Sequence, residues 1–436
     1  MSAVQALRQA RTFDSLRKHR NYRLYFSGQV VSVTGTWVQN VAQAWLVVEL
    51  THSAVAVGLL AACQFGPFAV LGLLGGVLVD RLDYRKTLLA TQVAMMSTAL
   101  LLGTLVLTHV AQVWMVDVIA AANGLVLVLD TPARQSFTIQ MVGRRELPNA
   151  VALNSSVFNA SRLLGPGLGG LIIATAGIGI CFMINAASYL AVIGGLLLMH
   201  VDELHPVKRA APGQSLRHNL RQGLDYAWRT PRVRLVLLMM LVVATLGMNF
   251  NVLLPLLASR TLHSGPEVFG LLSACFGAGA LVGALVSASL ARAMMPLLIA
   301  AAGGFGVFEL LLAPQHTVVG AAIVLALVGV CFTLYTANSN STLQMAVPDQ
   351  LRGRVMSLYA YVFFGTAPLG GLLAGWLADR GGTELAYFVA GAAGVVMAVY
   401  ALLHLGALGA VRQRVSRRRR RPAGFDVATG TVVPRE

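Results

Sequence analysis

Residues 55–79 read VAVGLLAACQFGPFAVLGLLGGVLV, a run that contains no charged side chain. About 20 consecutive apolar residues in a helix span the ~30 Å hydrocarbon core of a bilayer, so this stretch is long enough to cross a membrane. Residues 235–257 and 385–408 are similarly apolar. Strands of a membrane barrel would instead alternate in polarity over roughly 10 residues, so we predict transmembrane helices.

The composition of the whole chain fits many such crossings. Apolar residues make up 56% of the 436 positions and charged residues 11%, which suits about a dozen spans of ~20 residues each. We therefore expect an all-α integral membrane protein with about twelve transmembrane helices. The expected spans are residues 24–50, 55–79, 88–108, 113–131, 149–175, 179–199, 235–257, 268–291, 296–313, 318–340, 355–378 and 385–408. The first span is too long for a cleavable signal, so we expect the amino terminus to be retained.

The positive charges are distributed unevenly between these spans. The formal net charge is +16, and with the amino terminus inside, every Lys and Arg except Arg162, Arg260 and Arg380 falls on one face. Cytoplasmic loops of membrane proteins carry the excess of Lys and Arg. We therefore expect both termini in the cytoplasm, with a bacterial plasma membrane as the natural location. The arginine run 417–421 is then a tail near anionic lipid, and nucleic-acid binding is disfavoured.

The longest polar stretch divides the spans into two groups of six. We expect a cytoplasmic segment at 1–23, a six-helix bundle at 24–199, a linker at 200–234, a second bundle at 235–408 and a basic cytoplasmic tail at 409–436. In the linker, Leu216, Leu220, Leu224 and Trp228 recur every four residues, which predicts an amphipathic helix. This helix could lie on the inner membrane surface or pack on the protein itself.

A weak internal repeat supports the division into halves. The segment FTIQM at 137–141 is matched by STLQM at 341–345, each after the fourth span of its half. Parallel repeats of this kind are typical of a transporter whose site lies between the two halves. Chance similarity between apolar sequences is the alternative.

A charged motif separates the second and third spans. Residues 76–86, GVLVDRLDYRK, resemble the signature of the major facilitator superfamily. The resemblance implies a cytoplasmic gate in which Asp80 caps or pairs with a helix of the other half, while Arg81 or Arg85 pairs with an acid near the inner end of span four. The implied gate residues are Gly76, Asp80, Arg81, Arg85, Lys86 and Asp130. The alternative is that the basic residues only anchor the topology, and Asp83 departs from the glycine that the family commonly has.

A glycine-rich motif lies in the fifth span. Residues 165–170, GPGLGG, contain a GxGxxG pattern, but no strand precedes it and it is embedded in an apolar span, which excludes a dinucleotide-binding loop. The motif resembles the Gly-Pro motif in span five of the superfamily's antiporters, which favours export over import. Gly165, Pro166, Gly169 and Gly170 would allow close helix packing. Packing without any role in coupling is the alternative.

The chain also resembles a narrower group, the transmembrane secretion effector branch of that superfamily, which includes enterobactin exporters and macrolide efflux pumps. This resemblance extends over about residues 13–380. The residues that carry it are Ser32, Gly35, Trp37, Gln39, the segment DTPAR at 130–134, Asn149, Ala150, Asn154, the segment RLLGP at 162–166, Gly223, Tyr226 and Pro231.

Polar residues inside the spans indicate a translocation path, because such groups are costly in a membrane and usually functional. Arg162 lies about 20 Å into span five, close to the middle of the bilayer. It could face a central cavity or tie helices together. Span one carries a polar stripe at helical spacing, whose alternative role is hydrogen bonding between helices. The candidate path residues are Gln29, Ser32, Thr36, Gln39, Asn40, Gln43, Asn123, Arg162, Thr245, Asn249, Tyr335 and Asn338.

Proton coupling needs a carboxyl group that can alternate between protonated and paired states. The candidates are Asp117, Glu49 and Glu309, with Asp117 preferred because it is the deepest. All three lie toward the outer ends of their spans, so each could instead be an interfacial residue.

These features together favour a secondary active transporter, a proton-coupled exporter of a small amphipathic organic compound such as a drug or siderophore. The alternatives are an importer or passive facilitator of a small metabolite, and, less favoured, a membrane enzyme or scaffold. We expect no ATP site, because no GxxxxGK[ST] loop is present, and no cofactor. We also expect no metal or disulfide, because all four cysteines fall inside spans. A monomer is the default expectation.

Overall fold

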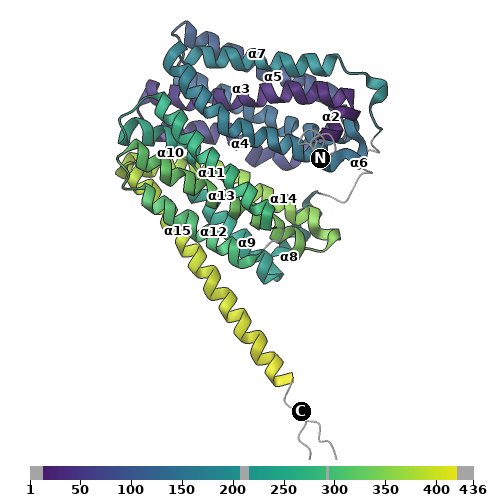
Figure 1. Ribbon diagram of the computed structural model, residues 1–436, viewed down its shortest axis with the longest axis vertical. Coiled ribbons are helices and arrows are strands. Elements are labelled where there is room, and N and C mark those ends of the chain that lie inside the picture. The colour runs from purple at the N-terminus through teal and green to yellow at the C-terminus, as the bar shows by residue number, and fades with distance from the viewer. Residues whose placement is uncertain (1–12, 207–215, 291–293, 420–436) are drawn as a thin grey trace, which may run out of the picture.

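The computed structural model describes residues 13–206, 216–290 and 294–419. Within those ranges the chain is helical and contains no β-strand. Figure 1 shows two bundles, one from α2 to α7 and one from α8 to α15, which we call the N-half and the C-half. The all-α fold predicted from the apolar runs is confirmed. The expected cytoplasmic segment is described only from residue 13, and the expected tail lies in part outside the described residues.

The N-half begins with a short helix that packs beside the bundle. Its elements are α2 (Asp14–Lys18), α3 (Arg20–Thr51), α4 (Ala54–Val79), α5 (Tyr84–Leu107), α6 (Val113–Ala176) and α7 (Ile178–Leu197). A 3₁₀ turn, η2 (Val201–Glu203), follows.

The C-half begins with a helix of the linker. Its elements are α8 (Leu216–Arg229), α9 (Pro231–Gly247), α10 (Phe250–Leu256), the π-turn η3 (Leu257–Thr261), α11 (Pro266–Leu290), α12 (Met295–Leu312), α13 (Val318–Ala346), α14 (Asp349–Gly365) and α15 (Ala367–Arg419).

Nine helical segments of the described chain are long and apolar enough to cross a membrane. One of them, α6, has 64 residues and at 1.5 Å per residue is about three times longer than the bilayer core is thick. Its helix is broken at Gly143, where φ is 70° and ψ is 173°. The segment expected to connect spans four and five is thus helical on both sides of one glycine. A similar break at Gly381 and Gly382 divides α15.

Two expected spans differ from simple apolar helices. The polar stripe of α3 keeps this 32-residue helix outside the nine apolar segments. The seventh expected span is interrupted between α9 and α10, where Asn249 Nδ2 donates to the carbonyl oxygens of Thr245 and Leu246. The side chain thus satisfies carbonyls that the interruption leaves without helical partners.

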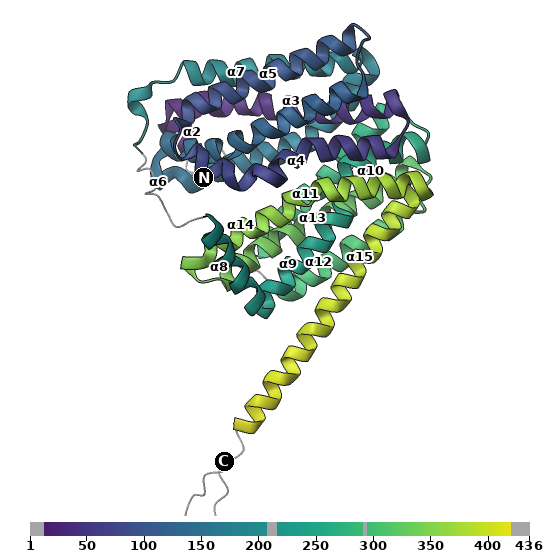
Figure 2. The ribbon, with the colours of Figure 1, turned by 180° about the vertical axis from the view of Figure 1, so that it is seen from behind.

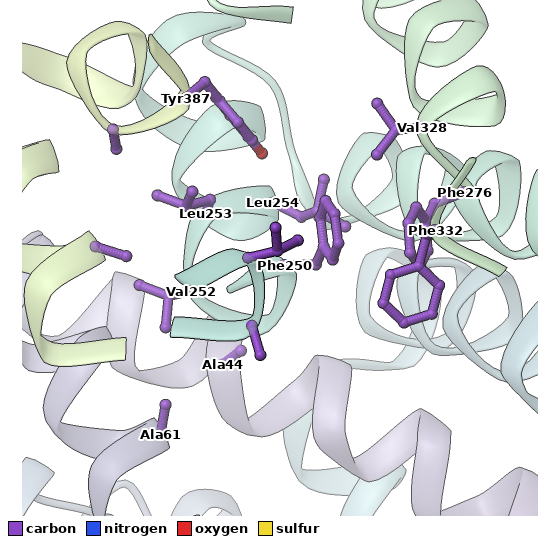
Figure 3. Close-up of a cluster of buried hydrophobic side chains, with 14 of the residues drawn as sticks. Ala44, Ala61, Phe250, Val252, Leu253, Leu254, Phe276, Val328, Phe332 and Tyr387 are labelled. Atoms are coloured by element: carbon purple, nitrogen blue, oxygen red, sulfur yellow. The ribbon is translucent and has the colours of Figure 1, made fainter. Parts of the chain in front are cut away.

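The two ends of the bundles carry different residues. We call the end with Arg81, Arg85 and Lys86, between α4 and α5, the basic end. The opposite end carries the turns at 52–53, 108–112, 262–265 and 314–317. In both Figure 1 and Figure 2 the two bundles lie closest on the side of α10 and diverge toward α2 and α8. One of the buried apolar clusters crosses between the halves, and Figure 3 shows Ala44 and Ala61 of the N-half beside Phe250 and Val252 of the C-half.

Candidate functional site

The halves meet along two helix pairs, α4 with α15 and α6 with α11. Glycines allow the backbones to approach closely. A Cβ atom on Gly58 would lie 2.5 Å from the carbonyl oxygen of Gly371, and one on Gly170 would lie 2.5 Å from that of Pro266. Both contacts lie in the part of the interface nearer the opposite end. Small residues therefore bring the halves together there.

A charged contact closes the same end. Asp379 of α15 accepts hydrogen bonds from the backbone nitrogens of Ala54 and Val55, at 3.0 and 3.1 Å, and so caps the first turn of α4 in the other half. Arg260 pairs with Asp379 at 2.9 Å and also donates to the carbonyl oxygen of His52. We call Asp379, Arg260 and residues 52–55 the Asp379 latch.

The interface is open toward the basic end. The aromatic contact between Phe68 and Phe364, 5.9 Å between ring centroids, lies midway along α4. Beyond it, a Cβ atom on Gly76 would meet nothing within 4 Å. On the second helix pair, Val151 of α6 and Leu285 of α11 are 51% and 64% exposed. The halves are thus joined at one end and separated at the other.

The expected gate residues do not reach the other half in this conformation. Asp80 and Arg81 are exposed, and Arg85 Nε donates to the carbonyl oxygen of Leu196 at 2.8 Å. Asp83, at the position where the motif departs from the family pattern, caps α5 by accepting from the backbone nitrogen of Lys86.

An apolar cavity of about 550 Å³ lies between α4 and α6 of the N-half. Its walls are Leu71, Leu74, Gly75, Val77, Leu78, Arg81, Leu125, Val128 and Leu129.

Asp130 has a different partner from the one expected. It pairs with Arg134, one helical turn later in α6, at 2.6 Å, and not with Arg81 or Arg85. Thr91 and Gln92 of α5 donate to the same carboxylate. The side-chain spacing of four within one helix makes the Arg134 pair available without any movement of the α4–α5 turn. Arg134 also donates to Gln29 and to Tyr25 of α3.

The polar stripe of α3 is partly engaged within the N-half. Gln39 accepts from Asn185 of α7 at 2.6 Å, and Asn40 accepts from Gln64 of α4 at 3.4 Å. Thr36 donates to the carbonyl oxygen of Ser32 in its own helix. Gln43 is 4% exposed and its amide nitrogen has no partner in the described structure. The stripe therefore forms hydrogen bonds between helices and also leaves some polar atoms without a hydrogen-bond partner among the described residues.

The other path candidates lie on several helices. Asn123 accepts from Thr98 within the N-half. In the C-half, Thr245 donates to the carbonyl oxygen of Leu241. The side-chain oxygen of Asn338 accepts from the backbone nitrogen of Met294 at 3.5 Å. Tyr335 is fully buried, and its hydroxyl has no partner among the described residues.

Arg162 lies at the interface between the halves. Its guanidinium carbon is 5.0 Å from the ring centroid of Phe276 in α11 and 4.8 Å from that of Phe332 in α13. Gly277 of α11 packs against the backbone of Arg162 and Leu163. An N-half cation therefore rests on aromatic rings of the C-half.

The glycine-rich motif packs on two sides. Gly165 and Gly169 face α3, where Cβ atoms would meet Trp37 and Val38, while Gly170 faces α11 across the interface. Pro166 is buried, and its carbonyl oxygen would lie 2.6 Å from a Cβ atom on Gly270.

The three acids expected as coupling candidates have different surroundings. Glu49 accepts from the indole nitrogen of Trp45 at 2.7 Å. Asp117 is 9% exposed, and one of its carboxyl oxygens has no partner in the described chain. Glu309 is fully buried in α12, and neither of its carboxyl oxygens has a partner there. The structure does not bring these acids together.

Sequence reasoning missed Arg134, Arg260 and Asp379. Arg134 had a visible signal, because it follows Asp130 by four residues. Arg260 was noticed only as an exception to the charge distribution. Asp379 had no local signal, because its partners belong to the other half of the chain.

The family model described as transmembrane secretion effector matches residues 10–427. The chain belongs to this family. This secretion effector chain is 24% identical to the staphyloferrin A transporter of Staphylococcus aureus, over 85% of this chain and 92% of that protein. It is 27% identical to the multidrug efflux pump Tap of Mycolicibacterium fortuitum (81% and 88% covered) and 26% identical to the enterobactin exporter EntS of Salmonella typhimurium (91% and 95% covered).

Solved structures show the same fold. The nucleoside transporter NupG superposes with a TM-score of 0.68 at 12% identity, covering 88% of this chain and 98% of that one. A bacterial homolog of the human lysosomal transporter Spinster superposes with a TM-score of 0.63 at 13% identity, covering 87% and 95%. These structures show the fold. Membership of the transmembrane secretion effector family, which is part of the major facilitator superfamily, shows that the chain is a multi-pass membrane transporter and not an enzyme.

Proposed function

We propose that this secretion effector chain exports a small amphipathic organic compound from the cytoplasm by alternating access. We assign the basic end to the cytoplasm of a bacterium, because Lys and Arg accumulate on the inner side of membrane proteins. Both termini then lie inside. The linker helix α8 fits this placement, because Leu224 and Trp228 are 53% and 63% exposed and can enter the inner membrane surface.

One observation carries the proposal: the Asp379 latch joins the halves at the opposite end while the basic end is open. With the basic end inside, this is the conformation that admits a substrate from the cytoplasm. Export then requires the latch to open and the basic end to close around the same central path. In that second state, Gly76, Asp80, Arg81, Arg85 and Lys86 are the N-half residues available to contact the C-half.

The substrate class follows from the walls of the path. Polar side chains of α3 and the aromatic cluster around Arg162 suit a molecule with hydrogen-bonding and apolar parts. The relatives include an enterobactin exporter, a multidrug efflux pump and a macrolide efflux protein. A drug or siderophore-like compound is the corresponding substrate here.

Proton coupling is assigned first to Asp117. It lies in α6 of the N-half with an unpartnered carboxyl oxygen, as expected of a group that exchanges a proton for a partner when the access changes. Glu309 is the second candidate, because a fully buried acid without a partner must be neutral to remain in the membrane. Glu49 is the third.

Transport in two steps tests this function. Cells that overproduce or lack the protein are screened for altered susceptibility to a library of toxic amphipathic compounds. Each hit is then offered to everted vesicles whose interior is more acidic than the medium. Accumulation that depends on the gradient and falls in the Asp117→Asn variant supports proton-linked export. Accumulation in right-side-out vesicles instead identifies an importer, and flux without a gradient identifies a facilitator; either result contradicts the proposal.

A further inference from the structure

Arg162 is a cation near mid-membrane whose protein contacts are aromatic. The rings of Phe276 and Phe332, at 5.0 and 4.8 Å from its guanidinium carbon, belong to the C-half, whereas Arg162 belongs to the N-half. Phe276 also packs against Phe250, at 4.3 Å between centroids, so the cation rests on the edge of a larger aromatic cluster.

The guanidinium has no acidic partner. None of the ion pairs formed by the described residues includes Arg162, and none of their hydrogen bonds uses its donors. A guanidinium carries five N–H donors in one plane. Contacts with two rings offset only part of the cost of keeping such a charge away from bulk water. The donors are therefore available to water or to a bound molecule.

The surface toward the basic end is apolar and open. Phe158 lies one helical turn before Arg162 in α6 and is 51% exposed. It meets Trp37 of α3 edge to face, with 5.8 Å between ring centroids. A molecule that enters from the basic end would thus meet the aromatic side chains of Phe158 and Trp37 first and Arg162 deeper in the membrane.

We propose that Arg162 binds a carboxylate group of the transported molecule, so that the substrates are amphipathic organic anions. The inference rests on the proposed function and deepens it by naming the charge of the substrate. The planar fork of an arginine matches a carboxylate through two parallel hydrogen bonds. The apolar body of the same molecule would pack against Phe158 and Trp37.

Binding of matched acids and esters tests the charge class. The full chain in lipid nanodiscs is titrated with naphthylacetate, pyrenebutyrate and anthracene carboxylate, each beside its methyl ester, and binding to empty nanodiscs is subtracted. We expect at least one acid to bind more tightly than its ester. Arg162→Gln should weaken that acid by at least about tenfold and leave the ester unchanged, because a hydrogen-bonded charge pair is lost.

The control removes a comparable arginine elsewhere. Arg234 lies 5.9 Å from the ring of Trp228 at the basic end, and Arg234→Gln should bind acid and ester as the wild type does. If Arg162→Gln does not give folded protein, Arg162→Lys is used. Lysine keeps the positive charge but lacks the planar guanidinium, so this substitution should weaken binding of the acid severalfold.

Three results of the binding experiment would overturn the inference: every acid binds no better than its ester, no acid binds at all, or the acid binds equally well to the Arg162 variant. A neutral or cationic compound that the vesicles accumulate would leave the proposed export intact while removing the anionic substrate class. Binding of an acid through Arg162, together with no gradient-dependent accumulation of any compound in everted vesicles, would instead contradict the proposed export and leave the binding site in place.

Discussion

The carboxylate of Asp379 lies 3.0 Å from the backbone nitrogen of Ala54, although the two residues belong to opposite halves. The first turn of a helix has amide groups without intrahelical partners, and its dipole favours a negative charge. Asp379 supplies both the acceptor and the charge from outside the helix. The sequence motif at 76–86 implied a cap between the halves at the basic end, and in this conformation the cap is formed at the opposite end.

Replacing Asp379 by Asn should shift the protein toward opening at this end. The amide keeps the size of the side chain but loses the charge that α4 and Arg260 bind. Because both ionic partners are about one-third exposed, we expect a loss of about 1 kcal/mol or less, which changes the population ratio severalfold. Labelling of a cysteine introduced by Val55→Cys should be faster in the Asp379→Asn background.

The control for this variant is Asp349→Asn. Asp349 also pairs with an arginine, Arg352, but the pair lies within α14 and is more exposed. Equal labelling rates in the Asp379→Asn variant, the control and the parent would show that the latch does not hold the halves together.

The stability of the contact between His19, before α3, and His205, after α7, should fall in mild acid. His19 stacks edge to face on His205 at 5.9 Å. Partial burial, and then the neighbouring His205, lower the pKa of His19 below its ordinary value of about 6.5. The neutral form is thus favoured by the folded state. The resulting stability is complete above the ordinary pKa and is lost as the pH falls through the lowered one.

Thermal unfolding as a function of pH tests this. Between about pH 7 and pH 5 the wild type should lose more stability than His19→Gln, whose side chain does not titrate. Parallel curves for the two proteins would remove His19 from any pH response.

The glycine-rich motif offers a matched pair of substitutions. A Cβ atom on Gly170 would lie 2.5 Å from the carbonyl oxygen of Pro266, whereas one on Gly167 would meet only the Cβ of Ala274, at 3.7 Å. Gly170→Ala should force α6 and α11 apart and cost about 1–3 kcal/mol. Gly167→Ala should be neutral or slightly stabilising, because alanine favours a helix. Melting temperatures in detergent measure both, and equal values would show that the close approach at Gly170 is not required.

The buried pair of Asp130 and Arg134 should matter more than a surface pair of the same spacing. Asp130→Asn leaves Arg134 in a largely buried position without its counter-ion, at a cost of about 3 kcal/mol. Asp14→Asn breaks the exposed pair with Lys18, also four residues apart, and should cost less than about 1 kcal/mol. A smaller loss of stability for Asp130→Asn than for Asp14→Asn would contradict this account.

The sequence predicted most of the fold because a membrane imposes strong patterns on it. Apolar runs such as 55–79 could only be helices in lipid, and the family resemblance carried by 76–86 and 165–170 was confirmed. The continuous helix through 132–142 was not foreseen, since its polar composition looks like a loop. The candidate path and coupling residues stay predictions. Contacts such as Ala54 with Asp379 depend on how two distant helices meet, which no local pattern records.

The central claim is that the halves rock about a shared path, and distances across both ends test it directly. With the natural cysteines replaced, spin labels are attached at Ser155→Cys and Leu285→Cys near the basic end, and in a second protein at Val110→Cys and His316→Cys at the opposite end. Addition of a transported compound and a proton gradient should shorten the first distance and lengthen the second. Distances that change in the same direction, or that do not change during measurable transport, would contradict the account.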